Sequence, residues 1–479
     1  MRPTLSEILQ FESPRLNPRR APVLSSIITG GAALLFVTLL AQAFFRGGLA
    51  AWSVGVAYIL YDTCLLVFTA WQMRRMMPPA PVVKGQTKSS GAARLTLCVV
   101  IAAHNEERAI PVTLDALLRQ TDLPDLIVIA DDGSSDGTAT LLRGRYGLEP
   151  DTRSTVPGRP DLLWLPVEHG GKARVLNHAM VFVDTDIVVT VDADTLVEEH
   201  ALGALRLRFA NEAALVAATA VLTPVCGASA SARLFEWFQR YEYIRNFISR
   251  FAWMQLGSLL LVSGAFAAFR REAVMAVGGF DPACYVEDYE LIHRLHRHSI
   301  DHDLGWTVRV IGEAHARTDA PETLPAFLRQ RRRWFAGFLQ TQHWNRDMTG
   351  NPRFGDLGTV MMPVKSLDTV QPLYGLAAFA ILITVVAIGQ YAIALPILLV
   401  MLGKIAIDMS FHLWSLSVYR RWTGGTRAIG WPKAIVAALL EPFTFQLLRH
   451  AGAAWGWWTF LTGRQSWGRQ NRRGIVAQG

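Results

Sequence analysis

Apolar and polar residues follow different patterns in different parts of the chain. Long, mainly apolar stretches stand near both ends, at residues 24–45, 51–73, about 370–390, 391–416 and about 435–461. Between them, from about residue 95 to 310, short apolar runs rich in β-branched residues alternate with segments of helical period. Each long stretch reaches the roughly 20 residues with which a helix crosses a bilayer. The pattern therefore predicts a folded domain inserted between membrane-spanning helices.

The middle segment alternates strands and helices. Strands are predicted at 95–102, 125–130, 162–167, 186–191 and 215–223, and helices at 106–120, 136–145, 172–183 and 199–209. A repeated strand–helix order favours parallel strands joined by crossover helices. We therefore expect an α/β domain with a mostly parallel sheet and helices on both faces.

Two segments near this domain, 231–255 and 327–344, mix aromatic residues with arginines at helical spacing. A helix of this composition can lie in the membrane interface. The same spacing is also typical of an amphipathic helix that faces a protein core. Both interpretations stay open.

These patterns divide the chain into seven parts. They are an N-terminal segment (1–23), two transmembrane helices (24–73), a linker rich in Pro, Gly, Ser and Lys (74–94), the α/β domain (95–320), interfacial helices (321–365), a C-terminal transmembrane region of about three helices (366–463) and a basic tail (464–479). Basic residues before the first span and after the second place both flanks in the cytoplasm and Arg46 on the opposite side. An odd number of C-terminal spans would put the basic tail outside, against this bias, so the topology there stays open.

Composition favours lipid over nucleic acid as the large partner. Lys and Arg number 47 against 39 Asp and Glu, a net charge of +8. The hydrophobic fraction of 51% and the 15 Trp residues fit a membrane protein, and no basic patch with interleaved aromatics has the look of a base-stacking surface, so we expect no nucleic-acid partner. The four cysteines have no metal-type spacing and indicate a reducing compartment.

The most informative short pattern is the acidic end of the apolar run at 187–191. Asp192 and Asp194 follow that run, which reads as a strand buried on both faces. Alternate residues of an extended chain point the same way, so both carboxylates can face one hard divalent cation. A cation there would neutralise a departing diphosphate. The alternative is a strand that stops in a solvated acidic turn.

Charged residues also follow the neighbouring strands. Glu106 and Asp132 stand where carboxylates can accept hydrogen bonds from a base or from ribose hydroxyls. Lys172 follows two glycines and can place a positive charge near a diphosphate, although the segment lacks the pattern of a phosphate loop. Asp136 is better explained as a cap of the next helix.

Two further motifs lie nearer the C-terminus. Glu287 and Asp288 open a helix; Asp288 can act as a general base toward a hydroxyl, although acids at a helix start are favourable for the helix dipole alone. Gln330, Arg333 and Trp334 form a Gln-x-x-Arg-Trp motif, which suits the stacking of a sugar ring or the pairing of a diphosphate.

In combination these motifs resemble those of processive, membrane-embedded family 2 glycosyltransferases with a GT-A domain, the group that contains cellulose, hyaluronan and poly-N-acetylglucosamine synthases. The resemblance covers about residues 95–345 and rests on Asp131-Asp132-Gly133, Asp192-Ala193-Asp194, Glu287-Asp288 and Gln330-x-x-Arg333-Trp334. The sequence departs from the family pattern at Val286, where many relatives have Thr, and in lacking the usual proline before His104.

The resemblance implies a role for each matched residue. Glu106 and Asp132 would contact the uridine, and Lys172 the nucleotide. Asp192 and Asp194 would hold the nucleotide and a Mg²⁺ or Mn²⁺ ion, with Asp194 the more direct ligand. Asp288, next to Glu287, would be the catalytic base. The acceptor end and the channel mouth would be formed by Phe280, Gln330, Arg333 and Trp334.

The expected activity is inverting transfer of a sugar from UDP-N-acetylglucosamine or UDP-glucose into a β-linked polysaccharide that is exported across the membrane. Expected partners are the donor, the growing polysaccharide, the bilayer and accessory export subunits, in a bacterial inner membrane with the catalytic domain in the cytoplasm. Two alternatives remain open: non-processive transfer of one sugar to a lipid acceptor, and a membrane transporter without chemistry.

Overall fold

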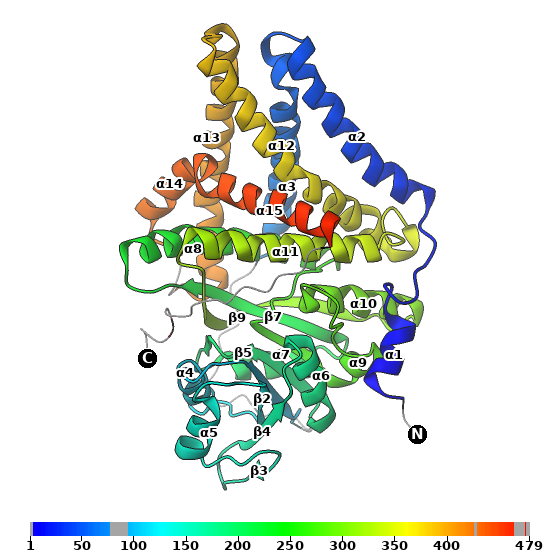
Figure 1. Cartoon of the computed structure of the whole chain (residues 1–479), viewed down its shortest axis with the longest axis vertical. Helices are drawn as coiled ribbons and strands as arrows, with labels where there is room; N and C mark the ends of the chain where they lie inside the picture. Colours follow the sequence, from blue (N-terminus) through cyan, green and yellow to red (C-terminus); the bar gives the residue numbers. More distant parts are fainter. Residues whose placement is uncertain (1–2, 77–93, 426–428, 464–474, 476–479) are drawn as a thin grey trace.

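The structure is a computed structural model that describes residues 3–76, 94–425, 429–463 and 475. Most of the expected linker and of the basic tail lie outside the described residues. Figure 1 shows an α/β domain at one end, a layer of helices across its top, and long helices that rise from this layer.

The α/β domain is built on one nine-stranded sheet of order β3-β4-β2-β1-β5-β8-β7-β9-β6. The strands are β1 (Leu97–Ala103), β2 (Leu126–Asp132), β3 (Arg153–Ser154), β4 (Asp161–Val167), β5 (Ile187–Asp192), β6 (Thr195–Val197), β7 (Leu215–Val225), β8 (Phe266–Arg270) and β9 (Thr307–Asp319). Strands β4, β2, β1 and β5 are parallel neighbours, and β7 pairs with β9 in the same sense. Strands β3, β6 and β8 add antiparallel pairs. Because the parallel ladders are the longer ones, the expected mostly parallel sheet is confirmed.

The inner strands are buried on both faces. Every residue of β2 and five of the six in β5 are buried, which explains why these strands read as continuous apolar runs. Helix α6 packs on β1 and β2, and α7 packs on β7 and β9. The helices of this part are α4 (Ile110–Leu117), α5 (Thr138–Tyr146), α6 (Lys172–Phe182), α7 (Ala201–Asn211), α9 (Arg271–Ala276) and α10 (Glu287–Asp301).

Helix α4 is shorter than the helix predicted at 106–120. It begins only at Ile110, because the residues after β1 form turns in which Asn105 has a φ of 57°. The side-chain oxygen of Asn105 accepts hydrogen bonds from the backbone N–H groups of Ser135 and Asp136 in the loop after β2. The loops after β1 and β2 are therefore joined at the carboxyl edge of the sheet.

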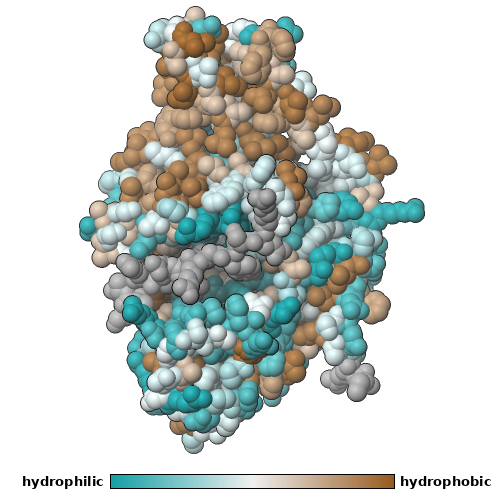
Figure 2. Space-filling model, viewed as in Figure 1, coloured by the Kyte–Doolittle hydropathy of each residue, from teal (hydrophilic) through white to brown (hydrophobic). Residues whose placement is uncertain are grey.

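Within the described residues, four helices are long and apolar enough to cross a membrane. They comprise α2 (Val23–Phe45), the η1–α3 segment (Gly48–Met73), the η3–α12 segment (Leu357–Ala387) and α13 (Tyr391–Trp422). On the face shown in Figure 2, the surface over these helices is mainly hydrophobic, whereas the surface of the α/β domain is mainly hydrophilic.

The apolar stretch at about 435–461 does not form one continuous helix. It is divided into α14 (Trp431–Leu440), the short turn Glu441–Phe443 and α15 (Phe445–Thr462). Pro442 lacks the N–H that a continuous helix would need at this point. Glu441 is buried and forms ion pairs with Arg245 and Arg449. Helix α15 instead lies along α11 (Leu324–Trp344), beside the α/β domain (Figure 1).

Helix α8 (Ala230–Gln255) occupies the junction between the two halves of the molecule. Phe235, Phe238 and Tyr241 pack with residues of α13, α14 and α15, whereas Phe247 and Phe251 belong to the core of the α/β domain. Its aromatic residues are therefore buried in protein, as expected of an amphipathic helix that faces a core, and its position in a membrane interface stays a prediction.

Candidate functional site

A cavity of about 1380 Å³ opens at the carboxyl edge of β1, β2 and β5, beneath α8 and α11. The loops that follow parallel strands meet at this edge, where ligands bind in open α/β sheets. All but one of the predicted site residues line the cavity: Glu106, Asp132, Lys172, Asp192, Asp194, Glu287, Asp288, Gln330, Arg333 and Trp334. Residues separated by more than 200 positions in sequence therefore share one cavity.

Asp132, the last residue of β2, organises the loop before α6. Its carboxylate accepts hydrogen bonds from the backbone N–H groups of Gly170 (2.8 Å) and Gly171 (3.0 and 3.1 Å), and lies 3.0 Å from Nδ1 of His169. Since Lys172 follows directly, Asp132 fixes where the lysine enters the cavity. Asp136 accepts from the N–H of Thr138, the first residue of α5, although Gly137 holds the N-cap position of that helix.

Lys172 connects the two acidic motifs. Its ammonium lies 2.5 Å from Oδ1 of Asp192 and 3.5 Å from Oε1 of Glu287, and it donates to the carbonyl of Gly264 at 3.2 Å. Burial works to lower the pKa of Lys172, but the surrounding carboxylates raise it above its ordinary value. The lysine is therefore a fixed positive charge at the centre of the cavity.

Asp192 and Asp194 form an anionic cluster with Asp319 at the end of β9, whose N–H donates to the carbonyl oxygen of Asp194 at 3.2 Å. Burial, followed by the charges of Asp192 and Asp319, raises the pKa of Asp194 well above its ordinary value. Lys172 pairs with Asp192, and carboxylate oxygens of this kind are the ligands that a hard divalent ion prefers. The residues thus fit the Mg²⁺ or Mn²⁺ expected from the sequence.

Asp288 lies at the start of α10 and is held from two sides. Its Oδ2 accepts from the N–H of Gly264 (2.6 Å), and its Oδ1 from its neighbour Tyr289 (2.8 Å). Burial and the nearby charge of Glu287 raise the pKa of Asp288 to about 6, against the opposing effect of Lys172. A carboxylate with a pKa near the working pH is well suited to general base catalysis.

Helix α11 supplies the side of the cavity that faces the membrane-type helices. Arg333 donates to the carbonyl of Tyr285 at 3.2 Å. Among the described residues, Oε1 of the buried Gln330 has no hydrogen-bond partner. The Arg331 guanidinium lies 4.6 Å from the centre of the Trp334 ring and pairs with Glu242 at 2.8 Å. These groups leave an amide oxygen and an indole available to a bound sugar.

Phe280 does not belong to this cavity. Its ring is buried against Phe269, and its backbone exchanges two hydrogen bonds of 2.7 Å with the side chain of Asn177. The expected acceptor contact of Phe280 therefore has no support in the geometry. The loop that contains Phe280 leads to Asp288, but it does not expose the Phe280 ring to the cavity.

Sequence reasoning did not single out two residues that the structure places at the site. A Cβ atom on Gly264 would stand 2.9 Å from Oδ2 of Asp288 and 3.2 Å from Nζ of Lys172, so a side chain there would displace the reactive groups. Arg250 of α8 lines the cavity, and within the described part of the chain its Nε and Nη1 atoms have no hydrogen-bond partner. Burial lowers the pKa of Arg250 to about 10. In the sequence, the pattern of arginines interleaved with aromatic residues in α8 was the one feature that pointed to Arg250.

Sheet order, acids at the strand ends and helices over the cavity together form the arrangement of a GT-A type fold joined to long apolar helices. Comparison with known proteins agrees with this class. Residues 187–402 match the family described as glycosyl transferase family group 2. This segment, a little under half of the chain, is thus similar to that family.

Two curated bacterial relatives match about half of the chain. YdaM of Bacillus subtilis, described as a probable glycosyltransferase, is 29% identical over 247 residues, or 50% of this chain and 54% of its own length. The poly-β-1,6-N-acetyl-D-glucosamine synthase of Staphylococcus aureus is 29% identical over 241 residues, or 50% of this chain and 53% of its own length. The chain therefore spans about half the length of the curated relatives that it matches.

One solved structure resembles the molecule over a larger share of the chain. The mannosyltransferase PcManGT from Pyrobaculum calidifontis, in complex with GDP-Man and Mn²⁺, matches with a TM-score of 0.54 at 20% identity. The match covers 85% of this chain and 99% of that protein. At this identity the likeness establishes the shared fold.

Proposed function

We propose that this protein is an inverting glycosyltransferase that polymerises a sugar from a UDP-sugar donor, UDP-N-acetylglucosamine or UDP-glucose, into a β-linked polysaccharide. The observation that carries the proposal is the convergence of Asp132, Lys172, Asp194 and Asp288 on one cavity with Trp334 at its membrane side. The similarity to a poly-β-1,6-N-acetyl-D-glucosamine synthase favours the first of the two donors.

The donor would lie along the edge formed by β1, β2 and β5. Glu106 and Asp132 stand on the side of the loops that would receive the uridine. Asp192 and Asp194 would hold a Mg²⁺ or Mn²⁺ ion, and Lys172 would be the protein's own cation beside the diphosphate. When bound, the metal supplies positive charge that stabilises the departing diphosphate.

The acceptor would approach from the side of α11. Asp288 takes the proton of the attacking hydroxyl, whose oxygen forms a bond to the anomeric carbon while the bond from that carbon to the phosphate oxygen breaks. The electron pair of the broken bond leaves with UDP. The N–H groups of Gly264 and Tyr289 hold the Asp288 carboxylate in place for this transfer.

A second cavity of about 270 Å³ supports a path for the product through the membrane-type helices. It shares Arg331, Trp334 and Phe338 with the catalytic cavity and is also lined by Tyr58, Asp62, Gln371, Gln446 and His450. Side chains that donate and accept hydrogen bonds around an aromatic ring suit a carbohydrate. We propose that the growing chain leaves by this route into or across a bacterial inner membrane, with accessory export subunits as further partners.

The test is release of UDP by the purified full-length protein, screened over UDP-sugars with Mg²⁺, with Mn²⁺ or with EDTA. We expect release from one of the two named donors, loss of release in EDTA, and a loss of at least about 100-fold in kcat for Asp288→Asn, as is typical when a general base is removed. Asp303→Asn, an exposed acid outside the cavity, is the matched control. Near wild-type turnover by the Asp288 variant would exclude this residue as the base.

Product length separates polymerisation from its closest alternative. Transfer of one sugar to a lipid would give a product of fixed size that extracts into organic solvent, whereas a polymerase gives a ladder of increasing length. No UDP release with any sugar nucleotide would favour a transporter without chemistry.

A further inference from the structure

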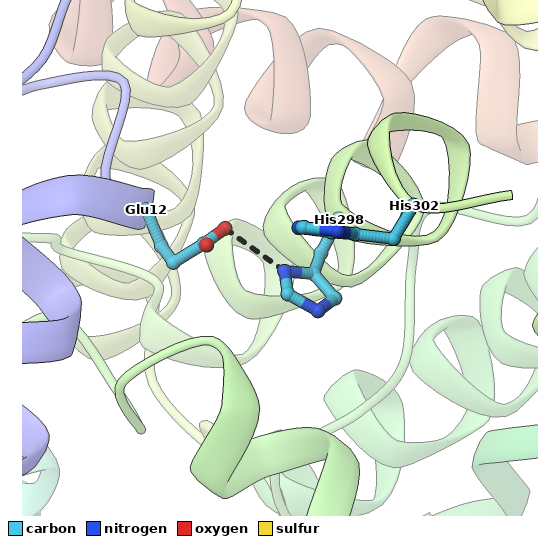
Figure 3. A group of neighbouring side chains, drawn as sticks. All are labelled: Glu12, His298 and His302. Atoms are coloured by element: carbon cyan, nitrogen blue, oxygen red, sulfur yellow. Dashed lines mark hydrogen bonds and ion pairs between the residues drawn. The ribbon is translucent and has the colours of Figure 1, made fainter. Parts of the chain in front are cut away.

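Three potential metal ligands lie together outside the catalytic cavity: Glu12, His298 and His302 (Figure 3). One ligand atom from each lies within 4.8 Å of the other two. Glu12 ends α1 (Leu5–Glu12), and the two histidines stand at the C-terminal end of α10. The cluster therefore joins the N-terminal segment of the chain to the catalytic domain.

The two histidines have the spacing that a helix needs to offer two ligands to one ion. Residues four apart lie on the same helix face, and the His298 and His302 rings lie 4.3 Å apart between their centres. Nδ1 of His298 faces Oε2 of Glu12 at 3.1 Å. The negative end of the α10 dipole also favours a cation here.

The surrounding contacts hold these ligands in place. The His298 ring stacks on Trp306, with 5.3 Å between ring centres. Just after Glu12, the Arg15 guanidinium makes two hydrogen bonds of 3.0 Å to the carboxylate of Asp281, which fastens this end of α1 to the loop before α10. The nearby Asp301 is already paired with Arg19 and Arg353. The histidines and Glu12 therefore remain as the ligand set.

We propose that Glu12, His298 and His302 bind one divalent ion of the zinc class, with water completing the coordination. Imidazole nitrogens with one carboxylate oxygen are a donor set that zinc accepts, whereas magnesium and calcium prefer oxygen ligands alone. The ion would link α1 to α10, the helix whose opposite end carries Asp288. The site is thus distinct in ligand chemistry from the all-carboxylate cluster around Asp194.

The experiment measures zinc binding to the full-length protein in detergent, in an Asp194→Asn background that weakens the catalytic metal site. After treatment with EDTA and titration with Zn²⁺, we expect the background protein to bind one more equivalent of zinc than the same protein with His298→Ala and His302→Ala. The exposed His178, which lies outside the cluster, supplies the control substitution His178→Ala and should leave binding unchanged.

Because His298 is packed against Trp306, the double variant is checked for folding by its melting temperature. If it does not fold, His302→Ala alone is used; this side chain is exposed, and its loss should weaken zinc binding at least tenfold. A second measurement is protease cleavage between α1 and α2, which zinc should slow in the background protein and leave unchanged in the His302 variant. Equal zinc stoichiometry and affinity with and without the two histidines would overturn the proposal, whatever the transferase activity.

Discussion

Asp288, the proposed general base, shows how its surroundings change the chemistry of a single residue. In water a carboxyl group of this type has a pKa near 4, whereas burial and Glu287 raise the pKa of Asp288 to about 6. A general base must be deprotonated to act. Its competence is therefore complete well above pH 6 and is lost as the pH falls through that value.

We accordingly predict that kcat/KM for the best UDP-sugar falls about tenfold for each pH unit below 6, as expected for one essential base. The measurement is a pH–rate profile between pH 5 and 8.5 at saturating Mn²⁺, so that weaker metal binding at low pH does not contribute. Product release is followed at each pH in enzyme first shown to be folded there. A flat profile down to pH 5 would contradict the assignment.

Gly264 is the second residue for which the structure gives a specific prediction. Its N–H holds Asp288, and its missing side chain leaves room for both Asp288 and Lys172. We predict that Gly264→Ala lowers kcat about 100-fold, since displacement of reactive groups by about 1 Å can have an effect of that size. The melting temperature should change little by comparison.

The matched control is Gly144→Ala in α5, where a Cβ would meet no atom within 4 Å. This substitution should leave activity unchanged and stabilise the helix by up to about 1 kcal/mol. Equal activities for the two alanine variants would show that the space at position 264 does not matter for catalysis.

At the scale of elements, α11 is held against the segment that carries Glu287 and Asp288. A Cβ on Gly337 would stand only 2.4 Å from Cγ2 of the buried Val286. Helix α15 approaches α11 in the same close manner, because Gly452 and Gly456 face Arg331 and Phe335. Glycines thus allow the close approach of α11 and α15, the helices that cover the cavity.

We predict that Gly337→Ala destabilises the protein by about 1–3 kcal/mol, the usual effect of overpacking a core, and lowers transferase activity. The additional substitution Val286→Ala removes both clashing methyl groups and should restore part of each property. Thermal unfolding and UDP release of the single and double variants test this coupling. Additive losses in the double variant would show that the two residues do not press on each other.

Some elements were predictable because they follow local rules, and others were not. The strand ending at Asp192 was placed to within one residue, since a fully buried parallel strand has a continuous apolar signal. Helix α4 was predicted too long because the hydrogen bonds of Asn105 to the next loop interrupt it. The stretch at 435–461 read as one apolar run because a sequence window does not show that Glu441 would find two arginine partners.

The part of the candidate site that stands at the strand ends was also predictable, because it follows from the fold class, whereas the part that stands in loops was not. Acids at strand ends meet wherever the sheet is parallel, so the convergence of Asp132 and Asp192 followed from the fold class. Phe280 and Gly264 depend instead on which way a loop turns its side chains, and no periodic pattern records that. Arg250 differs from the other arginines of α8 in lining the cavity, which is a tertiary property.

On the scale of the whole molecule, the four candidate spans bring the chain back to the side on which it started. The end of α13 contacts the α/β domain, where Trp422 lies against Phe251 and Gly312. Arg46 stands at the far end of α2. More basic residues stand at the domain ends of these spans, namely Arg19, Arg20, Arg74, Arg75, Arg420 and Arg421. Because basic residues at the ends of spans favour the cytoplasm, we expect the domain side to be cytoplasmic.

This arrangement gives a topology prediction for intact bacterial cells. A cysteine introduced at Gly47, between the first two spans, should react with a membrane-impermeant maleimide from outside. A cysteine at the exposed Arg174 in the α/β domain should react only after the cells are opened. The four native cysteines are replaced by Ala beforehand, and the reverse pattern of labelling would invert the proposed orientation.

The unequal sizes of the two adjoining cavities, about 1380 and 270 Å³, have a consequence for the shape of the product. If the glycan leaves through the smaller one, we expect a single unbranched chain to pass Arg331 and Trp334. Any branch or bulky substituent would then have to be added by other enzymes on the far side of the membrane, after the backbone has emerged.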